Sequence, residues 1–547
     1  MKKNAFTLVE LIAVIVLLCI IVLISFPALT NVIKGGEEKN KEEALNTIYM
    51  AAENYLMANY EDYIINNTGD TAYIYITDLI NNNYLNSDTI NPNNDSSFSS
   101  KDVVKITRNE DGTFKYELDY IKTLIEILLE QYNEDNTTGL VKDSTNSNLY
   151  YYTGTEEQVS NNYLWYGGHQ WRVLEFDTSA KTLTLISQQP LTSIQPASAV
   201  WTTKEAYESS YINTWLNDYF WNSLDNSIQS NILDNTFNVG IFTDVDEITT
   251  TQKVGLLDQT QYLRAGNTNS YLDIKNYFWL GNRCSSSAIC HVDYNGEFSY
   301  ANGSVSSENG IRVVIKIFDI TITGGDGTLI NSYRVRNKAT NTNNVQVGEY
   351  INVPYNGSDN ACGSDNICTF RVISKGDDSI KVVLNGLLST TSAWADNAKD
   401  NINTSDLIYT NVLTGFISNI DSKHRTTGTY GVGMYKDGDN YTVPQGTRIT
   451  AEIGLPTVGE MFSGNDIDLG STKTFVDVNT IENSTASIYY WTMNRSMSSF
   501  VIRVDYSGYI SSNLASSSFG VRPVIFLKNN LSFSGGNGTA QNPYTLN

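Results

Sequence analysis

The sequence predicts an α+β protein. We expect an N-terminal transmembrane α-helix that continues into a helix packed on a small antiparallel sheet, followed by two tandem antiparallel α+β repeat domains. Three observations predict this organisation: an uncharged apolar run near the N-terminus, a helical apolar pattern followed by a hairpin signal, and a long internal repeat. The 547 residues are 41% hydrophobic and 17% charged, a globular composition for several domains.

The apolar run is long enough to cross a bilayer. No charged residue falls in the 23 positions from Leu11 to Ile33, which extend about 34 Å as a helix. Lys2 and Lys3 precede the run, so the positive-inside tendency places the N-terminus in the cytoplasm and the later domains outside the cell. Pro27 is expected to kink this helix because it lacks an N–H donor.

The residues around position 6 carry a specific motif. The small residue Ala5 is followed by the string F-T-L-V-E from Phe6 to Glu10. This resembles the type IV prepilin leader shared by pilins and pseudopilins, although most family leaders end in Gly. The resemblance implies cleavage between Ala5 and Phe6 by prepilin peptidase and N-methylation of Phe6. It also implies that Glu10 neutralises the amine of a neighbouring subunit during assembly.

On this resemblance, residues 1–5 form a cleaved leader and residues 6–33 form the transmembrane and assembly helix, with Pro27 where pilin helices usually carry a proline. The alternative is a simple signal anchor, whose Glu10 would lie near the cytoplasmic edge of the membrane. That alternative leaves the F-T-L-V-E string unexplained.

Residues 34–121 are predicted to form a pilin-like spine and small head. Leu45, Ile48, Ala52 and Leu56 follow the spacing of an amphipathic helix. Two strand-like stretches then flank Asp111-Gly112, a hairpin turn signal. The basic residues of this region alternate with acidic ones, which predicts a solvated mixed face rather than a nucleic-acid track. The net charge of −23 also argues against nucleic acid as a partner. Residues 122–141 are predicted to be a helical linker.

An internal repeat fills the rest of the chain and divides it into domains 142–335 and 336–547. The string "YFWLGNRCSSSAICHVDYNGEFS" in the first copy matches "YYWTMNRSMSSFVIRVDYSGYIS" in the second. The copies resemble a domain of bacterial surface proteins with a distant likeness to C-type-lectin-like and formylglycine-generating-enzyme-like folds. The residues predicted to frame each copy are Trp279, Arg283, Asp293 and Arg312 in the first, and Trp491, Arg495, Asp505 and Arg522 in the second.

Four cysteines lie in two pairs of the same spacing, Cys284/Cys290 and Cys362/Cys368. Downstream of a membrane segment, such pairs predict two local disulfides, with free buried thiols as the alternative. A cysteine pair also serves catalysis in formylglycine-generating enzymes. The second copy, however, keeps the framing residues and replaces Cys284 with Ser496, so catalysis by this pair is not expected.

We therefore expect no catalytic residues, metal or cofactor. The spacing shared by Arg283/Asp293 and Arg495/Asp505 suits a structural ion pair better than a catalytic one. The predicted function is a pilin-like minor or tip subunit that displays two binding domains, with a glycan or a protein as the surface ligand. The alternatives are a pseudopilin of a type II secretion or DNA-uptake apparatus and, third, a surface enzyme.

Overall fold

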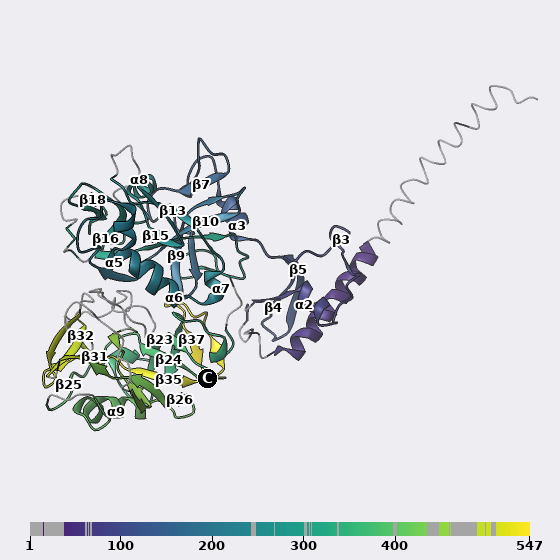
Figure 1. Ribbon diagram of the computed structural model, residues 1–547. Helices are drawn as coiled ribbons and strands as arrows, with labels where there is room; N and C mark the ends of the chain where they lie inside the picture. Colours follow the sequence, from purple (N-terminus) through teal and green to yellow (C-terminus); the bar gives the residue numbers. More distant parts are fainter. Residues whose placement is uncertain are drawn as a thin grey trace, which may run out of the picture. The chain divides into compact units, whose positions relative to one another are not determined.

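The computed structural model describes residues 15, 38–60, 63, 65, 68–69, 71–241, 248–266, 269–299, 304–305, 307, 309–335, 339–397, 402–434, 448–458, 460, 489–497, 499–504 and 510–547 (Figure 1). The chain divides into two units, Met1–Ile121 and Lys122–Asn547. The predicted leader and, apart from Ile15, the predicted transmembrane helix lie outside the described residues. Among the residues that are described, no helix is both long and apolar enough to cross a membrane.

The first unit packs one helix, residues 38–58, on a three-stranded antiparallel sheet. The sheet has the order β1-β4-β5, formed by Thr71–Tyr75, Asp102–Arg108 and Phe114–Tyr120. Ile48, Ala52 and Leu56 lie on one face of the helix, and all three are fully buried in a core shared with the sheet. The shorter elements are α2 (Ile76–Asn81), β2 (Ile90–Asn91) and β3 (Ser96–Ser97).

The predicted hairpin joins β4 to β5. At its turn, Asp111 Oδ1 accepts hydrogen bonds from the backbone N–H and the hydroxyl of Thr113. On β5, Lys115 forms an exposed 2.8 Å ion pair with Glu117, as expected for a face of mixed charge.

The second unit begins with the first copy, whose main sheet has the order β12-β20-β10-β9-β7-β6, with β8, β15 and β21 attached beside this path. These strands are β6 (Leu140–Lys142), β7 (Leu149–Tyr152), β8 (Tyr163–Tyr166), β9 (His169–Asp177), β10 (Thr182–Ser187), β12 (Ile232–Leu233), β15 (Val254–Leu256), β20 (Val313–Phe318) and β21 (Tyr333–Arg334). Strand β10 is buried along its whole length, as its central place in the sheet requires.

A second sheet and several short helices complete the first copy. The sheet has the order β11-β19-β16-β17-β18, formed by Thr192–Ile194, Asn309–Ile311, Phe278–Arg283, Ile289–Val292 and Phe298–Ser299. A ribbon pairs β13 (Asn235–Asn238) with β14 (Thr249–Gln252). The helices are α3 (Leu124–Gln131), α4 (Lys204–Glu208), α5 (Tyr211–Thr214), the π-helix η2 (Trp215–Phe220), α6 (Trp221–Ser223), α7 (Asn226–Gln229) and α8 (Gln259–Ala265).

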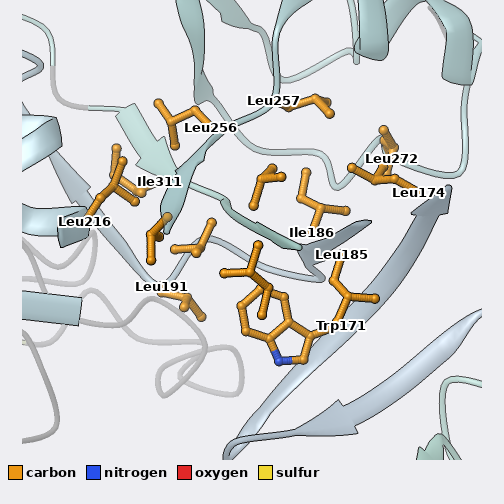
Figure 2. Packing of buried hydrophobic residues seen from close by; sticks show 14 of the residues in the cluster. Trp171, Leu174, Leu185, Ile186, Leu191, Leu216, Leu256, Leu257, Leu272 and Ile311 are labelled. Carbon is orange, nitrogen blue, oxygen red and sulfur yellow. The ribbon is translucent and has the colours of Figure 1, made fainter. Parts of the chain in front are cut away.

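The apolar core of the first copy lies between its sheets and helices. Figure 2 shows Trp171, Leu185 and Ile186 of strands β9 and β10 in one cluster with Leu256 of β15 and Ile311 of β19. The same core takes in Val458 and Ile502 of the second copy, so the two copies share buried apolar surface. The two copies therefore belong to one structural unit and are not independent domains.

The second copy repeats this topology. Its main sheet has the order β26-β35-β24-β23-β22-β37-β36, with β30 paired to β35. These strands are β22 (Tyr350–Pro354), β23 (Ile367–Lys375), β24 (Ser379–Leu384), β26 (Arg425–Thr426), β30 (Ile453–Gly454), β35 (Val524–Lys528), β36 (Phe533–Gly535) and β37 (Tyr544–Leu546). The run β12-β20-β10-β9-β8-β21 of the first copy thus corresponds to β26-β35-β24-β23-β22-β37.

The smaller elements of the second copy also correspond to those of the first. They are β25 (Ser392–Ala393) with β34 (Ser518–Phe519), the sheet β28 (Gly433–Met434), β31 (Tyr490–Met497), β32 (Phe500–Val504) and β33 (Ile510–Leu514), and the ribbon β27 (Gly428–Gly431) with β29 (Arg448–Ala451). The helices are η3 (Thr342–Asn344), η4 (Asn360–Cys362), the π-helix η5 (Tyr409–Leu413) and α9 (Thr414–Ser418).

The first copy starts earlier than the sequence pattern indicates. The backbone N–H of Leu124 donates to the carbonyl oxygen of Ile320 at 2.8 Å. The equivalent hydrogen bond of the second copy runs from the N–H of Thr342 to the carbonyl oxygen of Leu531, at 3.0 Å. Helix α3 begins at Leu124, with a capping box between Thr123 and Glu126. Because its apolar face is buried in the first copy's core, the stretch 122–141 belongs to that copy and is not a separate linker.

Candidate binding cleft between the two copies

The residues predicted for processing and assembly, Ala5, Phe6, Glu10 and Pro27, lie outside the described residues, as does the framing residue Asp505. The described groups that could carry a function are therefore those of the two copies and of the small first unit.

Trp279 and Trp491 occupy the same place in the two copies. Trp279 Nε1 donates to the carbonyl oxygen of Ile194 at 2.9 Å, and Trp491 Nε1 donates to that of Ser392, also at 2.9 Å. Both indoles are buried, with exposed fractions of 1% or less. A buried hydrogen bond that recurs in both copies serves the fold, because an unpaired indole N–H would be costly there.

Arg312 and Arg522 also correspond. Their Nε atoms donate to the carbonyl oxygens of Ser187 and Leu384, at 2.9 and 2.8 Å. Burial, together with the nearby positive charge of Arg172, lowers the pKa of Arg312 to about 9. These guanidinium groups hold the end of one central strand against the next, which is a structural role.

The pair Arg283 and Asp293 is not the ion pair that its spacing suggested. The register of the hairpin places Arg283 opposite Ile289, whereas Asp293 follows Val292 at the other end, beyond Phe278. Asp293 Oδ1 instead accepts the backbone N–H groups of Asn295 and Glu297, at 2.8 and 2.9 Å. The carboxylate thus shapes the turn between β17 and β18.

Both cysteine pairs are bonded in the structure, Cys284 to Cys290 and Cys362 to Cys368. The first bridge joins the residue directly after β16 to β17, and the second joins η4 to β23. Within the described ranges, no group of three or more His, Cys, Asp or Glu side chains could hold a metal ion.

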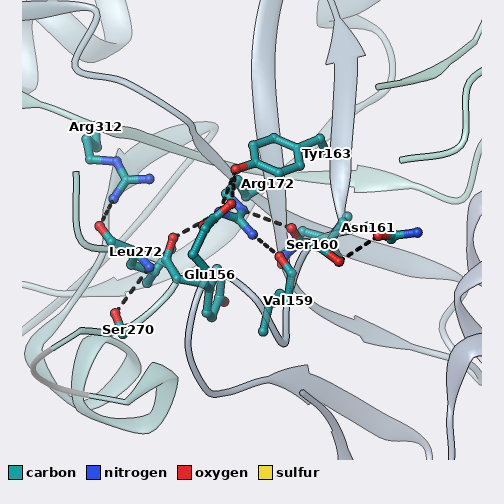
Figure 3. Close-up of polar contacts among 12 residues, drawn as sticks. Glu156, Val159, Ser160, Asn161, Tyr163, Arg172, Ser270, Leu272 and Arg312 are labelled. Carbon is teal, nitrogen blue, oxygen red and sulfur yellow. Dashed lines mark hydrogen bonds and ion pairs between the residues drawn. The ribbon is translucent and has the colours of Figure 1, made fainter. Parts of the chain in front are cut away.

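A buried arginine in the first copy has an unusually complete set of partners. Figure 3 shows Arg172 surrounded by Tyr163, Glu156 and Val159. Its Nη1 donates to the Tyr163 hydroxyl at 2.9 Å and pairs with the Glu156 carboxylate, while its Nη2 donates to the Val159 carbonyl oxygen. Burial raises the pKa of Tyr163, so its hydroxyl stays protonated at neutral pH.

The second copy has the same tyrosine and arginine without the segment that covers them. The N–H after Arg172 donates to the carbonyl oxygen of Asn162, and the N–H after Arg371 donates to that of Glu349. Because these hydrogen bonds are equivalent, the next residues, Tyr163 and Tyr350, also correspond. In the first copy 38 residues separate Leu124 from Tyr163, whereas only seven separate Thr342 from Tyr350. The missing residues include the counterparts of Glu156 and Val159.

Tyr350 and Arg371 instead line a cavity of about 200 Å³ formed by both copies. The Arg371 guanidinium carbon lies 5.9 Å from the centroid of the Tyr350 ring, and Trp165 lies beside that ring at a centroid distance of 6.5 Å and an interplanar angle of 56°. The other side chains that line the cavity are aromatic, amide or aliphatic: His169, Gln170, Gln188, Gln189, Leu191, Leu329, Ala540 and Gln541.

Two polar atoms of residues that line this cavity have no hydrogen-bond partner in the described part of the chain. They are the donor Nε1 of Trp165 and the acceptor Oε1 of Gln188, and both are buried. Gln170, in contrast, is held in place, because its Nε2 donates to the Leu329 carbonyl at 2.8 Å and to the Ser332 hydroxyl at 2.9 Å.

Two glycine backbones cross closely at Gly168, which lines the cavity, and Gly348. Gly168 has a φ of +78° and Gly348 a φ of +92°. A Cβ on Gly168 would lie 1.8 Å from the Val347 carbonyl oxygen, and one on Gly348 would lie 2.3 Å from the carbonyl oxygen of Gly168. Any side chain at either position would therefore force the copies apart, in addition to straining the backbone.

No motif in the sequence indicates this cleft. The repeat alignment does pair the strands that carry Arg172 and Arg371, and the difference in length before them is visible in the sequence. That difference in length indicates that Arg172 and Arg371 are packed against different residues.

No protein-family model, curated protein or solved structure matches this chain.

Proposed function

We propose that this chain is a type IV pilin-like surface subunit, at a minor or tip position, whose two fused copies bind a ligand outside the cell. The observation that carries this proposal is the N-terminal sequence. Lys2-Lys3, the small residue Ala5 and the F-T-L-V-E string from Phe6 to Glu10 come directly before an uncharged apolar run. The membrane is the proposed location before assembly, and other pilin subunits and prepilin peptidase are the proposed partners.

The first unit supports this proposal. Its helix, residues 38–58, follows the apolar run in the chain and packs on a small antiparallel sheet, which is the plan of a pilin spine and head. The unit Lys122–Asn547 then adds a much longer extracellular part. A head of that size on every subunit would crowd a helical filament, so a minor or tip position is favoured over the main polymer.

Binding is favoured over catalysis because the reactive side chains differ between the copies. Cys284 and Cys290 correspond to Ser496 and Ile502, and His291 corresponds to Arg503. The surrounding frame is the same in both. A constant frame that does not keep these reactive side chains suits recognition better than catalysis, since a scaffold can hold its fold while the groups it carries vary.

The test is the N-terminus of the mature protein. Mass spectrometry should find a chain that begins at methylated Phe6 in cells with prepilin peptidase and at Met1 in cells without it. Recovery of Met1 when the peptidase is active would contradict the proposal. Glu10→Val should leave membrane insertion intact and impair assembly, whereas Glu38→Val, which changes an exposed glutamate of the helix 38–58, should assemble normally.

A further inference from the structure

We infer that the cleft between the two copies binds a saccharide, with one sugar ring held between Trp165, Tyr350 and the glutamine side chains. This inference rests on the proposed binding function and names its ligand class. The cavity of about 200 Å³ has the volume of about seven water molecules at their liquid density. That space suits a single sugar ring and is too small for a folded protein loop.

The walls of the cleft have the composition that recognises a polyhydroxylated ring. Trp165 and Tyr350 present two aromatic surfaces inclined at 56°, and the apolar C–H face of a sugar packs on such surfaces. Gln188, Gln189 and Gln541 add amides, each of which both donates and accepts hydrogen bonds. No carboxylate is found among the described lining residues. These residues therefore offer no negative charge to a metal ion or a basic peptide.

The unpartnered atoms narrow the ligand chemistry further. Trp165 Nε1 can only donate a hydrogen bond and Gln188 Oε1 can only accept one. A hydroxyl group accepts and donates at once, so adjacent hydroxyls of one ring match both atoms when the two side chains turn toward the ligand. Leaving such atoms buried and unpaired is costly, which favours a bound state that supplies their partners. Gln188 is only half-buried, so rotation of its long side chain brings its amide to the ligand.

The cleft exists only because the copies differ. In the first copy, Glu156 and Val159 cover the Tyr163–Arg172 pair. The second copy lacks that segment, and its tyrosine and arginine line the cavity with residues of the first copy. Arg371 packs on Tyr350 and stiffens one aromatic wall. The ligand therefore requires both copies in one chain.

The experiment uses the full chain in a detergent without a sugar headgroup. Saturation-transfer NMR and titration calorimetry would test glucose, galactose, mannose, fucose, N-acetylglucosamine, N-acetylgalactosamine, glucuronate and N-acetylneuraminate up to tens of millimolar. We expect at least one to bind with a millimolar or lower Kd. The acidic members of the panel test whether Arg371 selects a carboxylated sugar.

Variants tie that binding to the cleft. Gln541→Ala removes an exposed amide, and Gln188→Leu removes the unpartnered acceptor at nearly constant size. Each should weaken binding about tenfold by removing a ligand hydrogen bond. Gln188→Leu should also unfold at no lower temperature than the wild type, which a purely structural role would not predict. Tyr294→Ala is the control, because Tyr294 is 56% exposed and does not line the cavity.

Absence of binding by every sugar, or binding that both glutamine variants retain, would overturn the inference. These outcomes are separate from those of the proposed function. A processed Phe6 terminus without sugar binding refutes the cleft alone, whereas sugar binding by a chain that keeps Met1 refutes the pilin-like role alone.

Discussion

Lys381 and Glu460 form a buried ion pair in the second copy. Replacing them singly and together measures how much this pair contributes to the stability of the fold. The two side chains are 7% and 4% exposed. The ammonium lies 4.8 Å from the centroid of the Tyr430 ring and 5.4 Å from that of Phe526. Glu460 Oε2 also accepts the backbone N–H of Thr457 at 2.9 Å.

At the corresponding positions, the first copy has neutral side chains in place of Lys381 and Glu460. The strand register puts Thr184 at the position of Lys381, and the capping pair Asp258–Gln261 corresponds to Thr457–Glu460. Removing one partner of a buried pair leaves the other charge uncompensated. We therefore expect Lys381→Thr and Glu460→Gln each to lower the free energy of unfolding by about 3–5 kcal/mol.

The double variant, which carries the residues of the first copy, should lose only about 1–2 kcal/mol, because no unpaired charge remains. The coupling free energy of the pair is then at least about 4 kcal/mol. Urea unfolding followed by tryptophan fluorescence measures it. With a slope of about 2–3 kcal/mol/M, each single variant should lower the midpoint by about 1 M or more.

Lys204→Thr is the control for this cycle, because Lys204 forms an exposed ion pair with Glu208. It should change the free energy of unfolding by about 0.5 kcal/mol or less. If the effects of the two single variants simply add in the double variant, the reasoning is refuted, since the charges would then be solvated independently.

Three further predictions follow from the fold. A fragment of residues 122–547 should fold, whereas a fragment of residues 142–547 should aggregate or show a lower melting temperature by circular dichroism. The shorter fragment lacks α3, whose three fully buried apolar side chains contribute about 1.5–3 kcal/mol each to the stability. Burial lowers the pKa of His291, so the stability it contributes is complete above its unfolded pKa of about 6.5 and is lost as the pH falls through that value towards the lower folded pKa. Urea midpoints measured across this range should be less dependent on pH for His291→Phe than for the wild type. Replacing Cys284 with Ser and Cys290 with Ile, the residues of the second copy, should cost about 2–3 kcal/mol by denaturant unfolding; alkylation of either thiol in the unreduced wild type would contradict the bridge.

The α+β class, the helix before a small antiparallel sheet and the repeated topology could all be predicted from the sequence. Each depends on residues close together in the chain or on a spacing that recurs. The period of apolar residues indicated the helix 38–58, and the Asp111-Gly112 turn fixed the hairpin. The C-x5-C pairs needed only a short loop to close. Local patterns of this kind survive whatever the rest of the chain does.

The boundary of the first copy, the separation of Arg283 from Asp293 and the cleft required the tertiary structure. Helix α3 belongs to the first copy because its apolar face is buried against strands nearly 200 residues further along the chain. Spacing alone did not show that Arg283 and Asp293 lie at opposite ends of a hairpin, because register depends on how two strands pair. The cleft depends on a contact between copies that only the glycine crossing permits. Such contacts join distant segments, so no local pattern encodes them.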